Sequence, residues 1–266
     1  MVSKLNKFFK LVGEGRRLND RWIILTHLSK APLYFLKRKL GKTYSHKLSG
    51  NVTLKNRDGI FFCGNNMLTV WAGSSFYELE SRPYFDLGEG VFIDIGANIG
   101  KFSIILGRRS REKIKVISIE PHPKNFKILT KNIELNKLDN VVVVNAACSD
   151  SKGYLDLYLD EADTGGHSII KGDNFPKMGV RSIRVKTEKL DNIVKRQKIE
   201  KVNLIKVDVE GAEATVLMGA KKILKKSHPK IIFEAWNKEK LEKVKKVLKP
   251  FKYEFKEIDP ENFLAY

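Results

Sequence analysis

The segment that most constrains the fold of this chain is VFIDIGANIGKFS, residues 91–103, in which a short apolar run leads into an acid and two spaced glycines. Residues 91–95 have the length and composition of a buried strand. Gly96 and Gly100 permit a sharp turn and a close approach of the backbone to a ligand. We expect a helix to begin near Asn98, with its free N–H groups facing the crevice at the end of the strand. The segment therefore predicts an α/β sheet with a ligand site at this turn.

The acid in this segment, Asp94, bears on which ligand the turn can hold. A dinucleotide-binding turn has the spacing G-x-G-x-x-G and sets its second glycine against a pyrophosphate, where this chain has Asn98. A carboxylate at Asp94 repels a pyrophosphate and suits a ligand with an ammonium group, such as the methionine part of S-adenosylmethionine (SAM). Glu120 ends the next apolar run, at the place of a ribose-binding acid. These residues favour SAM, with a dinucleotide or an ordinary strand-to-helix turn as alternatives.

Strand-like and helix-like patterns alternate after residue 90, which predicts a doubly wound parallel sheet with helices on both faces. Two further strand-like segments at the end of the chain suit an antiparallel edge. The expected strands are residues 91–95, 116–120, 141–147, 203–209, 231–235, 253–258 and 262–266, and the expected helices are residues 100–109, 123–136, 214–225 and 238–248.

Residues 1–50 are expected to form a basic helical N-terminal extension. They hold twelve of the 50 Lys and Arg residues but only two acids, in a chain with a net charge of +19. The spacing of Trp22, Ile23, Leu25 and Leu28 predicts one apolar face that packs on the body of the protein or on a partner. Such a region can contact an anionic membrane surface, nucleic acid or an acidic partner, and its lysines can equally be solvated.

The rest of the chain is expected to comprise a short leading segment and the main domain. Residues 51–90 are rich in glycine and aromatics, and the alternation around LTVWAG and SFYELE predicts short strands and a hairpin. Residues 91–266 form the main domain, which a polar insertion at 149–194 interrupts. This insertion is suited to a substrate loop, in which His167 and Ser168 are candidate substrate-binding residues.

Length and hydropathy exclude several classes of protein. A chain of 266 residues can bury a full core, as one large domain or one domain with an extension. No apolar run reaches the ~18 residues of a membrane span, and the basic start lacks the features of a signal peptide. We therefore expect a cytoplasmic protein, with peripheral membrane contact as a further option. Cys63 and Cys148 lack C-x-x-C spacing, which predicts neither a disulfide framework nor a zinc site.

A second group of candidate residues lies in LIKVDVEGAE, residues 204–213. Asp208 and Glu210 lie on the same side of a strand end, because alternate residues of a strand share a face. Either carboxylate can accept a proton from a substrate hydroxyl, but it can equally orient the substrate, hold a metal or cap the following helix. Glu234, at the end of the next strand, is a candidate substrate residue. Three carboxylates alone are too little to predict a metal.

The third strand ends in NAACSD, residues 145–150, where small side chains would let an adenine ring lie against the backbone. Ala147 is one of these small residues, and Asp150 is placed to accept a hydrogen bond from the exocyclic amine of adenine. Three further candidates for cofactor binding lie beside the earlier motifs: Ala97, Phe102 and Pro121.

Taken together, DIGANIGKFS, IEPHPKNFKILTKNIELN, NAACSD, the GGHSI loop and KVDVEGAE followed by VLMGAKKIL resemble the FkbM family of SAM-dependent methyltransferases. The resemblance covers residues 91–236. It implies a class I SAM-methyltransferase fold, a Rossmann-like sheet of seven strands with a reversed terminal strand, and methyl transfer most often to an oxygen of a sugar or other small molecule. It also implies site residues: Asp94, Gly96, Asn98 and Gly100 in the first SAM motif, Glu120 as the ribose acid, and Asp208 and Glu210 in the D-x-E-G segment.

The sequence therefore predicts an O-methyltransferase that acts on a hydroxyl of a sugar, glycolipid or related small molecule. One alternative is a tRNA or rRNA methyltransferase that uses the basic region, although the chain has DVEG where enzymes of this kind that methylate a base nitrogen often have an [N/D]-P-P-[Y/F] segment. The other alternative is a SAM-binding protein without catalysis, which would bind SAM and never yield S-adenosylhomocysteine.

Overall fold

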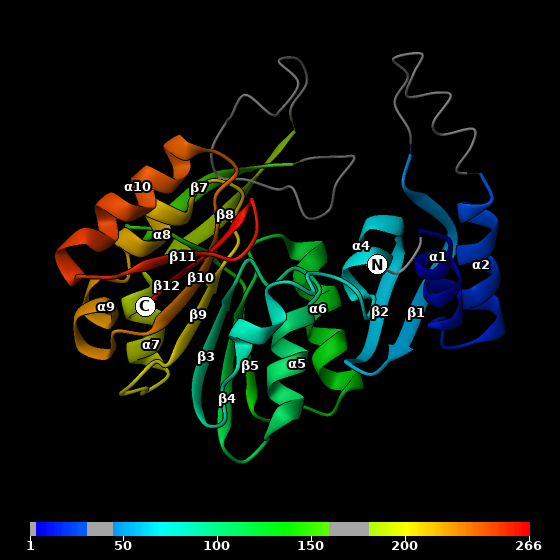
Figure 1. Cartoon of the computed structure of the whole chain (residues 1–266), viewed down its shortest axis with the longest axis horizontal. Coiled ribbons are helices and arrows are strands. Elements are labelled where there is room, and N and C mark those ends of the chain that lie inside the picture. The colour runs from blue at the N-terminus through cyan, green and yellow to red at the C-terminus, as the bar shows by residue number, and fades with distance from the viewer. Residues whose placement is uncertain (1–3, 31–44, 160–180) are drawn as a thin grey trace.

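The computed structural model describes residues 4–30, 45–159 and 181–266, and its centre is a seven-stranded sheet in the order β11-β12-β10-β9-β3-β4-β5 (Figure 1). β12 pairs antiparallel with both of its neighbours, and the other pairings are parallel. The expected sheet with a reversed final strand is therefore confirmed. Its strands are β3 (Gly90–Ile95), β4 (Ile114–Ile119), β5 (Val141–Val144), β9 (Leu204–Val207), β10 (Lys230–Glu234), β11 (Phe255–Glu257) and β12 (Asn262–Ala265).

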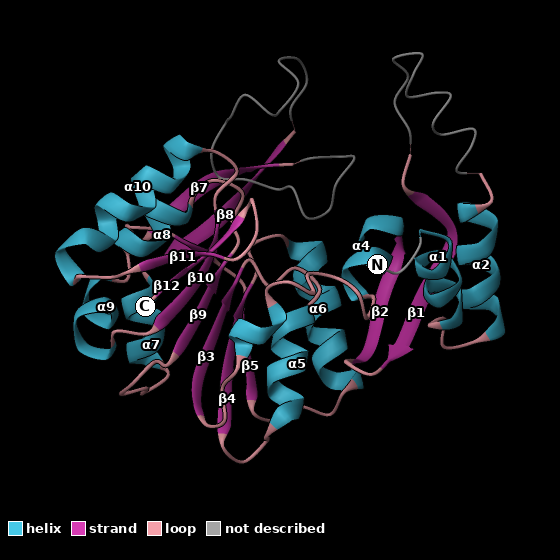
Figure 2. Cartoon of the chain, viewed as in Figure 1, coloured by secondary structure: helices cyan, strands magenta, loops and turns pink. Residues whose placement is uncertain are grey.

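Helices cover both faces of this sheet, which explains why its central strands are apolar on both sides (Figure 2). One face carries α5 (Lys101–Arg109) and α6 (Pro123–Leu135). The other face carries α7 (Leu190–Arg196), α8 (Glu213–Met218), α9 (Lys221–Ser227) and α10 (Lys238–Leu248).

Two of these helices replace the single helix expected over residues 214–225. The chain breaks at Gly219, whose backbone packs so closely on Ser149 that a Cβ there would lie 2.1 Å from the Ser149 carbonyl oxygen. Asp191 then accepts hydrogen bonds from the backbone N–H groups of Lys222 and Ile223 at 3.0 Å each, which satisfies the start of α9. The expectation of one helix was therefore wrong, because tertiary contacts stabilise a second helix start.

The N-terminal part contains α1 (Lys4–Gly13), α2 (Leu18–Leu28) and a hairpin of β1 (Lys47–Asn56) and β2 (Gly59–Asn66). The hairpin lies earlier in the chain than the LTVWAG and SFYELE segments where it was predicted. LTVWAG lies in helix α4 (Met67–Gly73) instead of a strand, and SFYELE forms turns. The side chain of Asn66 accepts a hydrogen bond from the N–H of Leu68 at 2.7 Å and caps α4, which the alternation of the sequence did not reveal.

The apolar face predicted for residues 22–28 is also wrong in part. Trp22 is 64% exposed, whereas Ile23 and Ile24 are buried. Asp20 accepts a hydrogen bond from the backbone N–H of Thr53 at 3.1 Å, which joins α2 to β1. This contact selects the helix face that packs on the hairpin and leaves Trp22 outside.

The expected third strand, residues 141–147, divides into β5 and the short β6 (Ala147–Cys148). β6 belongs to a separate three-stranded sheet with β7 (Gly153–Tyr158) and β8 (Ser182–Glu188). His167 and Ser168 lie outside the described residues. Among the residues described, no helix has both the length and the hydropathy that crossing a membrane requires.

Candidate active site

A pocket of about 910 Å³, its open mouth included, lies at the carboxyl ends of β3, β4 and β9. This is where open α/β sheets bind ligands. The pocket brings together residues that are distant in the sequence. Ten of the predicted site residues line it: Asp94, Gly96, Ala97, Asn98, Phe102, Glu120, Pro121, Ala147, Asp208 and Glu210.

The two glycines of the first motif are required by packing. A Cβ at Gly96 would lie 1.7 Å from the carbonyl oxygen of Asp208, so only glycine lets the β3 and β9 loops meet. A Cβ at Gly100 would lie 2.6 Å from a methyl group of Leu129 on α6, and Gly100 is not among the residues that line the pocket. Both have a left-handed backbone, with φ of 79° and 86°. Because this turn occupies residues 96–100, α5 begins at Lys101 and not near Asn98 as expected.

Asp94 lines the pocket, and its side chain already accepts two hydrogen bonds within the protein. Its Oδ2 atom accepts hydrogen bonds from the backbone N–H of Ser103 at 3.0 Å and from the Ser103 hydroxyl at 2.6 Å. Burial raises the pKa of Asp94, while Lys206 and the Ser103 hydrogen bonds oppose the shift. Asp94 therefore ties the end of β3 to the first turn of α5.

Glu120, just after β4, is held by the backbone on both of its oxygens. It accepts hydrogen bonds from the N–H of Asn98 at 2.9 Å and from the N–H of His122 at 2.8 Å. Burial raises the pKa of Glu120 to about 8, although these two hydrogen bonds favour its ionised form. The carboxylate is thus fixed in the pocket wall with lone pairs remaining.

Three non-glycine residues of the pocket have left-handed backbones: Glu78 with φ of 43°, Asn98 with φ of 51° and Glu210 with φ of 56°. This conformation is strained for residues with a side chain, and such strain gathers at functional sites. The Oδ1 atom of Asn98 is also buried, and no group of the described residues donates a hydrogen bond to it. Both features indicate a wall shaped for a ligand.

Lys206 is a pocket residue that the sequence interpretation missed. It lies on β9 with a side chain only 6% exposed, and its Nζ atom is 2.6 Å from Oδ2 of Asp208 and 3.9 Å from Oε1 of Glu78. Burial alone would lower the pKa of Lys206, but Asp208, Glu78 and Asp94 together raise it above its ordinary value. A lysine inside an apolar strand was the available signal, since lysine is rarely buried without a partner.

Tyr77 and Glu78 were also missed, and they come from the segment between α4 and the main sheet. Burial raises the pKa of Glu78, while Lys206 opposes the shift. Arg82, in the short helix η1 (Arg82–Phe85), holds this segment by donating to the backbone oxygen of Tyr77 at 3.3 Å and to both carboxylate oxygens of Asp58. No local pattern in the sequence marks these residues as part of a site.

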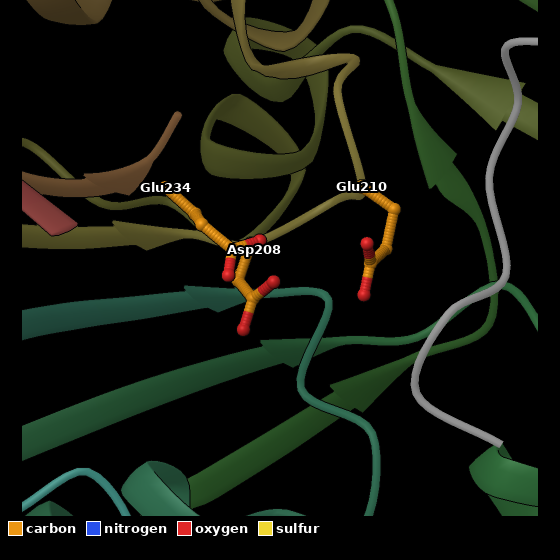
Figure 3. A group of neighbouring side chains, drawn as sticks. All are labelled: Asp208, Glu210 and Glu234. Atoms are coloured by element: carbon orange, nitrogen blue, oxygen red, sulfur yellow. The ribbon is translucent and has the colours of Figure 1, made fainter. Parts of the chain in front are cut away.

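Asp208, Glu210 and Glu234 lie close together, as predicted from their positions at strand ends, although Glu234 is not among the residues that line the pocket (Figure 3). One carboxylate oxygen from each lies within 4.8 Å of the others. Burial and the nearby charge of Asp208 raise the pKa of Glu234 to about 9, which favours its protonated form. Glu213, the first residue of α8, accepts hydrogen bonds from the N–H groups of Gly211 and Val209 and so fixes the turn before the helix.

The side of the pocket opposite the acids is apolar, with Ile119, Ala146 and Ala147 among its residues. Asp150, predicted to contact an adenine amine, is exposed and lines a separate shallow depression beside α7 and α9. The pocket therefore has an acidic side and a side lined by small residues, and Asp150 is not part of it.

The strand order, with β12 reversed, and a pocket at the carboxyl ends of β3, β4 and β9 define a class I methyltransferase. The family model described as the methyltransferase FkbM domain matches residues 94–261, and the chain belongs to this family.

Three proteins to which the chain is similar are named as methyltransferases. Methyltransferase sdnD of Sordaria araneosa is 27% identical over 59% of this chain and 68% of its own length. Hexuronic acid methyltransferase AglP of Haloferax volcanii is 29% identical over 49% of this chain and 50% of its own length. The crystal structure of methyltransferase FkbM from Methylobacillus flagellatus matches 98% of this chain and 58% of its own, with 15% identity and a TM-score of 0.49. The chain thus spans between half and about two thirds of these proteins.

Proposed function

We propose that this protein is a SAM-dependent methyltransferase that methylates a hydroxyl oxygen of a sugar, glycolipid or related small molecule. When bound, SAM supplies a methyl group on a positively charged sulfur. The observation that carries the proposal is the buried acceptor pair beside the first motif, the Oδ1 atom of Asn98 and the carboxylate of Glu120, in one pocket with Asp94 and Asp208.

The residues present fit this cofactor by their chemistry. Glu120 accepts two hydrogen bonds from the backbone, and a carboxyl group keeps further lone pairs in either protonation state, so it retains capacity for the ribose hydroxyl groups. Asn98 offers an unpaired acceptor within the described residues. The acids around Lys206 favour a cationic ligand and disfavour the pyrophosphate of a dinucleotide. Ala146 and Ala147 leave room for a flat ring.

The acceptor side is assigned to Asp208 and Glu210. The ion pair with Lys206 fixes the position of the Asp208 carboxylate, which can accept a proton from a hydroxyl group as that oxygen is methylated. The raised pKa of Glu234 favours its protonated form, which can donate a hydrogen bond in the same cluster. The name of the Haloferax volcanii relative supports an oxygen acceptor, because the heteroatoms of a hexuronic acid are all oxygens.

Calorimetric titration with SAM and, separately, with NAD tests this proposal. We expect micromolar SAM binding that weakens at least tenfold in Asn98→Gly and in Glu120→Gln. Asn98→Gly is compatible with the left-handed backbone and removes the side chain with its Oδ1 acceptor. Lys137→Gly is the matched control, since Lys137 also has a left-handed backbone, with φ of 55°, and does not line the pocket. NAD binding without SAM binding would overturn the proposal.

A second measurement tests the acceptor class. Production of S-adenosylhomocysteine with a panel of uncharged sugars, uronic acids and glycolipids should identify at least one acceptor, with a mass gain of one methyl group in the product. SAM binding with no turnover on any of these classes would contradict the acceptor assignment and favour either RNA or a non-catalytic role.

A further inference from the structure

The first half of α2 presents a surface whose charges all have one sign. The only two acids in residues 1–50, Glu14 and Asp20, are both buried. Glu14 accepts hydrogen bonds from the N–H of Ser75 at 3.0 Å and from the side chain of Asn56 at 2.8 Å. Asp20 accepts from the N–H of Thr53. Both acids are therefore used to attach the N-terminal helices to the hairpin, and they do not neutralise the cations outside.

The cations remain at the surface. Arg16, Arg17 and Arg21 are exposed, and no carboxylate of the described residues forms an ion pair with any of them. Lys10 at the end of α1 and Lys30 after α2 are exposed as well. The basic character of this region is thus a property of its folded surface and not only of its composition.

Two large apolar side chains lie among these cations. Leu18 is 81% exposed and Trp22 is 64% exposed. They are four residues apart, which places them one turn apart on the same side of α2, and Arg17 and Arg21 directly precede them. Phe9 on α1 is a third large apolar side chain in solvent, at 61% exposure. Exposed apolar groups gathered in this way mark a contact surface.

We propose that the α2 surface, defined as Arg16, Arg17, Leu18, Arg21 and Trp22, binds an anionic phospholipid bilayer. The arginines suit lipid phosphate groups, the amphipathic ring of Trp22 suits the interface, and Leu18 gains from contact with the acyl chains. An aliphatic side chain at 81% exposure has no comparable use on RNA, where bases stack on aromatic or guanidinium groups. The short helix α2 would lie on the membrane and not cross it.

Vesicle co-sedimentation of the full chain tests this proposal. Vesicles of phosphatidylcholine with 30% phosphatidylglycerol are compared with pure phosphatidylcholine vesicles. We expect binding to the anionic vesicles alone, and a loss of about 25-fold or more in Arg16→Glu/Arg17→Glu, at roughly fivefold for each of the two positive charges removed. Leu18→Ser/Trp22→Ser should also lose binding, because it removes the apolar contact while keeping every charge.

The matched charge control is Lys225→Glu/Lys226→Glu on α9, which lies at the opposite end of the molecule (Figure 1). It changes the net charge equally and should bind less than threefold more weakly than the unchanged protein. Equal losses in the two charge variants would overturn the proposal, because attraction would then be non-specific. Absence of vesicle binding would also overturn it, as would tight binding to a single-stranded RNA that anionic vesicles do not displace. Circular dichroism of each variant checks that it is folded.

Discussion

Lys206 and Asp208 point from the same side of β9 and its following turn, with Nζ and Oδ2 2.6 Å apart, so a buried cation fixes an acid that lines the pocket. Glu78 approaches the same nitrogen from outside the main sheet. The acidic side of the pocket is therefore arranged around Lys206. Its geometry depends on a buried positive charge, which is unfavourable in an apolar strand unless carboxylates pair with it.

We expect Lys206→Met to destabilise the protein by about 3–5 kcal/mol, because it leaves buried carboxylates without their cation. Urea denaturation measures the loss. The double variant Lys206→Met/Asp208→Asn should lose less than Lys206→Met alone, since one of the unpaired charges is then gone. A double variant as unstable as the sum of its single changes would show that the two residues do not interact.

Asp208→Asn should lower turnover by about 10²–10⁴-fold and leave the dissociation constant of SAM nearly unchanged, because an amide cannot take the hydroxyl proton. Steady-state formation of S-adenosylhomocysteine and calorimetry measure the two effects. Glu210→Gln is the companion variant, and the larger loss of turnover identifies which acid accepts the proton. Unchanged turnover in Asp208→Asn would remove Asp208 from the mechanism.

Gly96→Ala should cost about 3 kcal/mol or more, since its Cβ would lie 1.7 Å from the Asp208 carbonyl oxygen on a backbone with φ of 79°. Gly13→Ala is the control. Gly13 ends α1, and a Cβ there would have no heavy atom within 4 Å, so this change should be neutral or stabilise by up to about 1 kcal/mol. Thermal melting compares the two, and equal melting temperatures would contradict the contact between the loops.

The free protein should lose stability as the pH rises from about 5 to 9. Burial raises the pKa of Glu120 to about 8 and that of Glu234 to about 9, each from 4.5, so the folded state binds more protons than the unfolded state within this window. Ionisation then costs at most about 1.4 kcal/mol per pH unit for each group. Denaturant titrations at several pH values test this, and Glu234→Gln should show a flatter profile. A stability that rises from pH 6 to pH 9 would be the contrary result.

The sheet and its first motif could be predicted from the sequence because their signals are local. The apolar run before Asp94 predicts a buried strand, and the alternation of strand-like and helix-like segments after it predicts that the strands of the sheet are parallel. The proximity of the acids at strand ends could be predicted from the topology alone, since the carboxyl ends of parallel strands lie at one edge of the sheet. Asp94, Glu120 and Asp208 accordingly line one pocket.

The remaining features depend on contacts between distant parts of the chain. The exposed position of Trp22 follows from Asp20 and Thr53, which are 33 residues apart. Glu78 enters the site because Arg82 and Asp58 hold its segment, and Asp58 lies in a hairpin turn with no motif. The break between α8 and α9 follows from the packing of Gly219 on Ser149 and from Asp191 on α7, which lies outside the helix predicted over residues 214–225.

The buried residues on the α5–α6 face of the sheet form one hydrophobic cluster with those of the hairpin and the N-terminal helices, extending from Leu11 and Ile24 through Leu54 to Phe102 and Leu129. The boundary of the family match at residue 94 is therefore not a boundary of the hydrophobic core. A shortened chain that began at residue 94 would expose the apolar side of α5 and α6 to water. Loss of function in such a fragment would therefore reflect the damaged core and would give no information on membrane binding or on the acceptor.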